Sequence, residues 1–75
     1  MNIKIEKIIG NNIRILRMSK KMTQEDLATQ LQLNGSDITR SALAKIEVGQ
    51  RHIYADEIIL FKKILNVSYE ELFKI

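Results

Sequence analysis

The sequence of 75 residues repeats one helix-start arrangement four times, and this repetition constrains the fold more than any other feature. In each copy an apolar residue precedes the N-cap position, and a second apolar residue follows five positions after the first. The N-cap side chain accepts a hydrogen bond from the first helical turn, and the two apolar side chains form a hydrophobic staple. The copies are Met22-Thr23 with Leu27, Ile38-Thr39 with Leu43, Ile53-Tyr54 with Ile58, and Val67-Ser68 with Leu72.

These starts predict an all-α fold, a compact bundle of five helices in which one helix precedes the first copy. In that first helix Ile9, Ile13 and Leu16 lie on one stripe at helical spacing. Gly35 and Gly49 follow the second and third helices, where a residue in the left-handed conformation commonly closes the last turn. Tyr54 is a poor N-cap, so the fourth helix has the weakest start. The predicted helices lie near residues 6–20, 24–33, 40–48, 55–65 and 69–74.

The composition argues against an enzyme and against a metal-binding protein. The chain has no Cys and one His, which leaves no disulfide and no recognisable transition-metal site. Residues 1–75 form a single domain, whose core is too small for an elaborate active site. His52 and the pair Glu70-Glu71 could serve acid–base chemistry, but neighbouring residues on a helix do not converge on a substrate. We therefore expect no enzymatic activity, no cofactor and no small-molecule ligand.

The apolar residues are expected to form a core rather than a membrane span or a signal. The longest apolar runs, such as Ile58–Phe61, are far too short to cross a bilayer, and the sequence MNIKIEK lacks the apolar centre of a secretion signal. We therefore expect a cytoplasmic protein. Met18, Met22, Phe61 and Phe73 are interpreted as core residues.

The charge is distributed unevenly along the chain, whose formal net charge is +3. Residues 1–52 contain nine Lys or Arg and five Asp or Glu, a net +4. Residues 53–75 contain three and four, a net −1, and the two parts sum to +3. A modest basic excess favours an anionic partner, which would meet the first two thirds of the chain.

The third predicted helix has one apolar and one basic face. At 100° per residue, Leu43 and Ile46 point to the same side with Ala42 beside them, and Glu47 lies at the edge of that side. A short helix with small, basic and hydroxyl side chains outward fits a DNA major groove, where base edges offer acceptors and thymine methyl groups. The opposite face has no carboxylate and consists of Arg40, Ser41, Ala44, Lys45 and Val48.

Three segments together resemble the phage-repressor/Cro-type (XRE-like) helix-turn-helix family of bacterial and phage transcription regulators. They are TQEDLATQL, ITRSALAKIEVGQR and LNVSYEELF, and the resemblance extends from about Ile9 to Phe73. It implies a five-helix domain of the lambda-repressor-like DNA-binding type. The helices near 24–33 and 40–48 would form the DNA-binding motif. The implied function is sequence-specific binding of double-stranded DNA to regulate transcription, as a small stand-alone repressor or controller.

The resemblance also implies roles for individual residues. Arg40, Ser41 and Lys45 match the base-reading positions of the family, and Ala44 lies between them. Arg17 matches a basic residue that commonly pairs with a glutamate of the third helix, here Glu47, and we expect a partly buried structural ion pair. Four positions match phosphate-binding positions of the family: Gln24, Thr39, Gln50 and Arg51.

One segment departs from the family pattern. The turn between the two motif helices usually has about three or four residues, whereas here the residues from Gln32 to Ile38 make it longer. The second helix is expected to extend through Leu33, with a loop at Asn34-Gly35-Ser36. The family pattern therefore does not determine the tilt of the third helix on DNA, or how far Ser36 and Asp37 lie from the duplex.

Apolar residues in the last third suggest a protein partner. A homodimer through the fourth and fifth helices would place two third helices about 34 Å apart, suited to a palindromic operator. Alternatively, Ile59 packs against the amino-terminal segment. A second alternative is an antitoxin-type interaction module that binds a toxin, with DNA binding as secondary autoregulation. The candidate dimer residues are Ile59, Leu60, Phe73 and Ile75.

Overall fold

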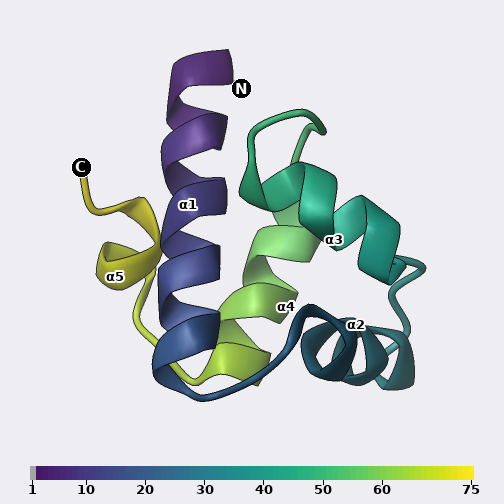
Figure 1. Cartoon of the computed structure of the whole chain (residues 1–75). Helices are drawn as coiled ribbons and strands as arrows, with labels where there is room; N and C mark the ends of the chain where they lie inside the picture. The colour runs from purple at the N-terminus through teal and green to yellow at the C-terminus, as the bar shows by residue number, and fades with distance from the viewer. Residues whose placement is uncertain (1) are drawn as a thin grey trace.

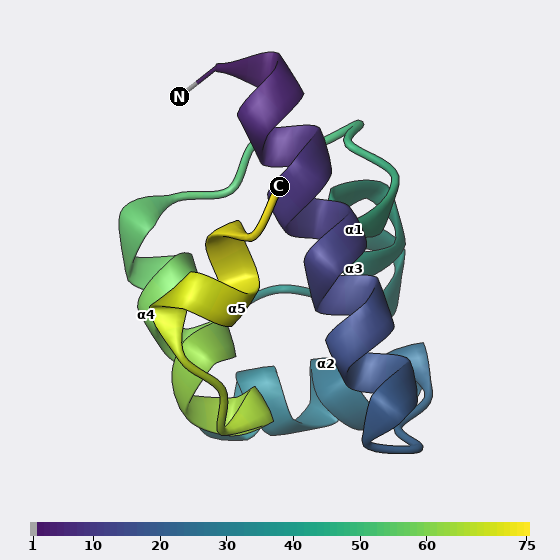
Figure 2. The same cartoon turned by 90° about the vertical axis from the view of Figure 1, so that its left-hand side faces the viewer.

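The computed structural model describes residues 2–75, and this part of the chain contains five α-helices and no strand. The helices are α1 (Ile3–Ser19), α2 (Gln24–Leu33), α3 (Arg40–Glu47), α4 (Ala55–Leu65) and α5 (Tyr69–Phe73). The long helix α1 contacts α3, α4 and α5, while α2 contacts α3 and α4. In Figure 1, α3 and α5 lie on opposite sides of α1. Figure 2 shows α5 between α4 and α1, with the carboxyl terminus beside α1. The predicted all-α fold is confirmed.

Each predicted N-cap stands at the start of its helix. The hydroxyl groups of Thr23, Thr39 and Ser68 each accept a hydrogen bond from the backbone N–H three residues on. Tyr54 makes no such side-chain bond, and its own N–H instead donates to Glu57 Oε1 at 3.0 Å. These contacts satisfy N–H groups that have no partner within the helix, and for that reason four of the five starts fall where the sequence predicts them.

Helix α1 begins three residues before its predicted start near residue 6. Asn2 acts as the N-cap, because its Oδ1 accepts a hydrogen bond from the Lys4 N–H at 2.8 Å. The first turn also includes the carboxylate of Glu6, which is favourable near the positive end of a helix dipole. The added turn extends α1 beyond the other helices at the top of Figure 1.

All five helices contribute to one apolar core. Phe61 is its largest fully buried side chain, and the predicted inward residues Ile9 and Ile13 are also fully buried. The interpretation of Met18 and Phe73 as core residues is wrong, because their exposed fractions are 52% and 41%. Both occupy outward positions, near the end of α1 and in the last turn of α5. The buried apolar residues are Ile9, Ile13, Leu27, Ala28, Leu31, Ile38, Leu43, Ile46, Ile53, Ile58, Phe61, Leu65 and Leu72.

The long turn between α2 and α3 is anchored at both ends. Gly35 has a φ of 91°, and the Ser36 N–H bonds to Leu31 O at 3.0 Å, which closes α2 in the manner of a Schellman motif. Ile38 is fully buried, and its carbonyl accepts a hydrogen bond from Gln32 Nε2 at 3.0 Å. Residues 34–37 therefore form a surface loop between these two anchors, and α2 extends through Leu33 as the sequence predicts.

Candidate nucleic-acid interface

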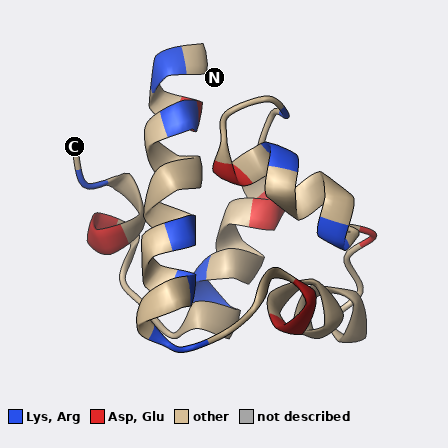
Figure 3. Ribbon diagram, in the orientation of Figure 1, with Lys and Arg blue, Asp and Glu red and all other residues tan. Residues whose placement is uncertain are grey.

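The outward face of α3 has the composition predicted for a DNA-reading helix. Arg40, Ser41 and Lys45 are exposed and Ala44 is partly exposed, whereas Leu43 and Ile46 on the opposite face are fully buried. Within residues 2–75, neither basic side chain of α3 forms an ion pair. Figure 3 shows the Lys and Arg positions of α3 near its two ends. The cations are therefore available to an outside partner.

A buried ion pair fixes α3 against α1. Arg17 Nε donates to Glu47 Oε2 at 2.7 Å and Nη2 donates to Oε1 at 3.1 Å, a bidentate arrangement in which the side chains are 9% and 1% exposed. Arg17 Nη1 also donates to Met22 O at 2.7 Å. The pair is more deeply buried than the partly buried pair that the sequence suggests. It orients α3 from its inward side.

Gln24 extends this network into α2. Its Nε2 donates to Glu47 Oε1 at 3.0 Å, so the carboxylate is shared by residues of α1 and α2. The side chain is partly exposed at the amino-terminal turn of α2, where backbone N–H groups and the helix dipole favour an anion. In this structure Gln24 therefore has an internal partner, and its role as a phosphate contact stays a prediction. Thr39 is exposed at the start of α3, with its hydroxyl engaged as the cap.

Gly10 permits a close approach of α1 to α3 and was not recognised in the sequence. A Cβ atom at this position would lie 2.0 Å from the carbonyl oxygen of Ile46 and 3.4 Å from Glu47 Cα. Since these are backbone atoms of α3, no side-chain movement could make room. Only glycine fits here, and a glycine within a predicted helix is the signal that could have revealed the crossing.

The loop after α3 contains Gln50 and Arg51, which the sequence assigns to phosphate binding. Gln50 is exposed, and its N–H closes α3 by donating to Lys45 O at 2.8 Å. Arg51 forms a bidentate pair with Glu57, with N–O distances of 2.9 and 3.0 Å. This hydrogen bonding raises the pKa of Arg51. Burial raises the pKa of Glu57, but the bonds from Arg51 and the Tyr54 amide outweigh it, so that pKa lies below its usual value.

A second buried carboxylate, Glu6, ties α1 to the same loop. Glu6 Oε2 accepts a hydrogen bond from the Ile53 N–H at 2.8 Å, and Oε1 lies 2.7 Å from His52 Nδ1. The hydrogen bond from the Ile53 N–H, and then the hydrogen bond with His52, lower the pKa of Glu6. His52 is exposed, as expected, but its pairing with Glu6 was missed because the two residues are far apart in the sequence. The contact holds the loop that follows α3.

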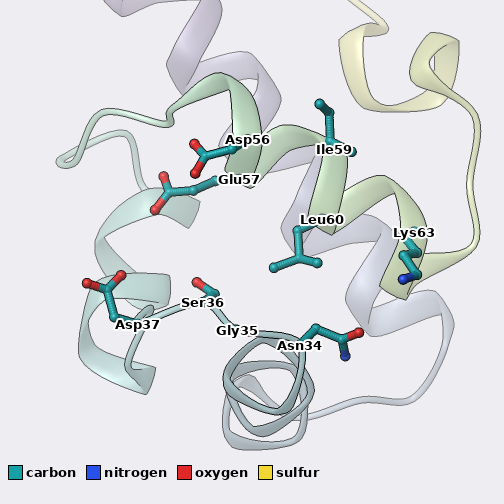
Figure 4. Close-up of a pocket in the computed structure, with 9 residues that line it drawn as sticks. All are labelled: Asn34, Gly35, Ser36, Asp37, Asp56, Glu57, Ile59, Leu60 and Lys63. Atoms are coloured by element: carbon teal, nitrogen blue, oxygen red, sulfur yellow. The ribbon is translucent and has the colours of Figure 1, made fainter.

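The predicted dimer residues occupy two places in the molecule. Ile59 is 56% exposed on the outer side of α4, whereas Leu60 is partly buried and packs against the core. Both line a groove of about 590 Å³ between α4 and the long turn, with Asp37 and Asp56 at one end (Figure 4). Phe73 stacks on Tyr69 at a centroid distance of 6.4 Å, and the exposed Ile75 follows beside α1.

Other kinds of site find little support in the described part of the chain. Residues 2–75 contain no group of three or more His, Asp or Glu side chains that could hold a metal ion. None of the described helices combines the length and apolar character that a membrane crossing requires. The exposed basic face of α3 is therefore the best-formed candidate site.

Comparison with known proteins identifies the motif. A family model described as "Helix-turn-helix" matches residues 13–72, which include α2, the long turn and α3. No curated protein and no solved structure gives a match. Because the family match covers most of the chain and agrees with the all-helical fold, the chain belongs to the Cro/C1-type (XRE-like) helix-turn-helix family, whose members are DNA-binding regulators.

Proposed function

We propose that the protein is a sequence-specific regulator of transcription that binds double-stranded DNA through α3, as a small repressor or controller. The observation that carries the proposal is the outward face of α3. It presents Arg40, Ser41 and Lys45 without a carboxylate, on a helix whose other side is fixed by a buried ion pair. A preorganised helix of this kind loses little conformational freedom when it enters the major groove.

Different residues recognise the bases and bind the phosphates. Arg40, Ser41 and Lys45 read base edges. Ala44, which lies between them, contacts a base edge or a thymine methyl group. Gln24, Thr39 and Gln50 bind backbone phosphates and set the register of the protein on the duplex. Arg51 contributes positive charge while it remains paired with Glu57, and reaching a phosphate would require it to leave or share that partner.

Selection of bound duplexes from a random pool, repeated at two salt concentrations, tests the function. Wild-type protein should enrich one sequence, and affinity should fall steeply with salt because phosphate binding releases counterions. The variant Arg40→Ala should lose discrimination at one position of each half-site, by about 1–3 kcal/mol. Lys63→Ala, on α4, is the matched control and should keep the wild-type preference. An unchanged preference profile for Arg40→Ala would refute the base-reading assignment.

We also propose that the protein acts as a homodimer on a palindromic operator. Exposed apolar side chains on α4 and α5, chiefly Ile59 and Phe73, support an interface in the last third of the chain. Sedimentation should detect dimers at micromolar concentration, and Phe73→Asp should shift them to monomers. Only monomers of the wild-type protein at high micromolar concentration would remove this part of the proposal.

A further inference from the structure

We propose that the first turns of α1, which precede the residues matched by the family, are part of the DNA-binding surface, and that Lys7 binds a backbone phosphate there. This inference rests on the proposed function and extends it to a segment outside residues 13–72. The ligand is the phosphodiester backbone of the duplex whose bases α3 reads, at the strand that the loop after α3 follows.

The amino-terminal part of α1 is fixed to that loop. The Glu6 carboxylate is 4% exposed and accepts the Ile53 N–H at 2.8 Å while its other oxygen lies 2.7 Å from His52 Nδ1. One buried side chain thus joins the first turn of α1 to two consecutive loop residues. Since the loop begins where α3 ends, any DNA that α3 and the loop contact lies close to this part of α1.

Lys7 lies directly against the end of α3. A Cβ atom built on Gly49 would be 2.8 Å from Lys7 Cγ, 3.0 Å from its Cβ and 3.2 Å from its Cα, so the lysine stem covers the glycine. Gly49 has a φ of 79° and leads into Gln50, whose N–H closes α3. The packed stem places the start of a flexible cation beside Gln50, a predicted phosphate contact.

The surrounding charges favour an anion at this position. Lys7 is exposed and forms no ion pair within residues 2–75. The only acidic residue of α1 is Glu6, which is buried and already bonded, so no exposed carboxylate of the helix competes for the lysine. Arg14 follows seven residues after Lys7 and lies on the same edge of the helix, on the other side of Gly10. Figure 3 shows basic positions along α1, on the loop and on α3.

The test compares two charge-neutralising variants, Lys7→Gln and Lys63→Gln, with wild type on a short duplex that carries the selected sequence. Glutamine keeps methylene groups against Gly49, so the change removes the charge with little loss of packing. The dissociation constant is measured from low to moderate salt. Lys7→Gln should bind roughly 3–10-fold more weakly, and the slope of log K against log salt should decrease by about 0.9, the contribution of one phosphate. Lys7→Arg should restore both.

The controls separate the possible failures. Circular dichroism and thermal unfolding establish that Lys7→Gln is folded, and base preference should be unchanged because a phosphate contact does not read sequence. If Lys7→Gln has the same affinity and the same salt slope as Lys63→Gln, the inference is wrong while the proposed function stands. If the wild-type protein binds no duplex, the proposed function fails and the inference fails with it.

Discussion

Gly10 sets the distance between α1 and α3. We expect Gly10→Ala to lower the free energy of unfolding by about 1–3 kcal/mol or more, because its Cβ would lie 2.0 Å from Ile46 O and overpacking must displace a backbone. Alanine has the higher helix propensity, by roughly 1 kcal/mol, so the steric cost must exceed that gain. Urea denaturation measures the effect. The control is Asn11→Ala at the exposed neighbouring position. A more stable Gly10→Ala variant would contradict the close crossing.

Removing one partner of the Arg17–Glu47 pair should lower the free energy of unfolding more than replacing both partners with apolar residues. Since both side chains are buried, Glu47→Gln leaves a buried guanidinium without its counter-charge, and we expect a loss of about 3–5 kcal/mol. The double variant Arg17→Met/Glu47→Met should recover much of that loss, because it removes both charges together. Chemical denaturation of Arg17→Met, Glu47→Met and the double variant gives the coupling free energy. Additive losses would show that the two residues do not act as a pair.

Glu6 should make stability depend on pH in the acidic range. Its bonds to the Ile53 amide and His52 lower its pKa below the ordinary 4.5, so the unfolded chain binds the proton more tightly. The contact therefore contributes its full stabilisation when the pH is above the ordinary pKa of 4.5. That stabilisation is lost as the pH falls through the lower pKa of the folded state. The stability difference between wild type and Glu6→Gln should be largest near neutral pH and shrink as the pH falls below 4.5.

Thermal unfolding across this pH range measures the difference for Glu6→Gln and for the control Glu25→Gln, at an exposed position of α2. A difference between wild type and Glu6→Gln that stays constant with pH would contradict the account.

At the scale of helices, the local patterns predict most of the fold. Capping residues and staples depend on neighbours in the sequence, and so the starts at Thr23, Thr39, Tyr54 and Ser68 all fall as expected. The start of α1 does not, because Asn2 was not recognised as its cap. Contacts between distant segments have no such local signal. The bond between Glu6 and Ile53 and the pair Arg51–Glu57 appear only once the helices are packed.

The two glycines that end α2 and α3 should differ in their tolerance of alanine. Both have positive φ, at 91° for Gly35 and 79° for Gly49, and so both should lose about 1–2 kcal/mol from backbone strain. Gly35 has open space around a new Cβ, whereas at Gly49 the Cβ would press on Lys7. Gly49→Ala should therefore be the more destabilising of the two in thermal unfolding. Equal losses would argue against the packing of Lys7 on the end of α3.

For the whole molecule, the uneven charge predicts which side meets DNA, but the contacts depend on packing. The net +4 of residues 1–52 includes Arg17, which is buried, and Arg51, which is paired with Glu57. Sequence alone could not distinguish these cations from the free ones of α3. The sequence also could not show which of the candidate dimer residues are exposed. Helical periodicity does not indicate that Leu60 faces the long turn while Ile59 is exposed.

Chemical-shift mapping by NMR, in which the protein is titrated with its selected duplex, tests directly whether the exposed face of α3 binds DNA. We expect the largest amide shifts at Arg40, Ser41, Ala44 and Lys45, with smaller changes at the start of α2 and in the loop after α3. Amides of the outer side of α4 around Lys63 should change little. Large shifts confined to α4 and α5, with α3 unaffected, would contradict recognition of DNA by the exposed face of α3.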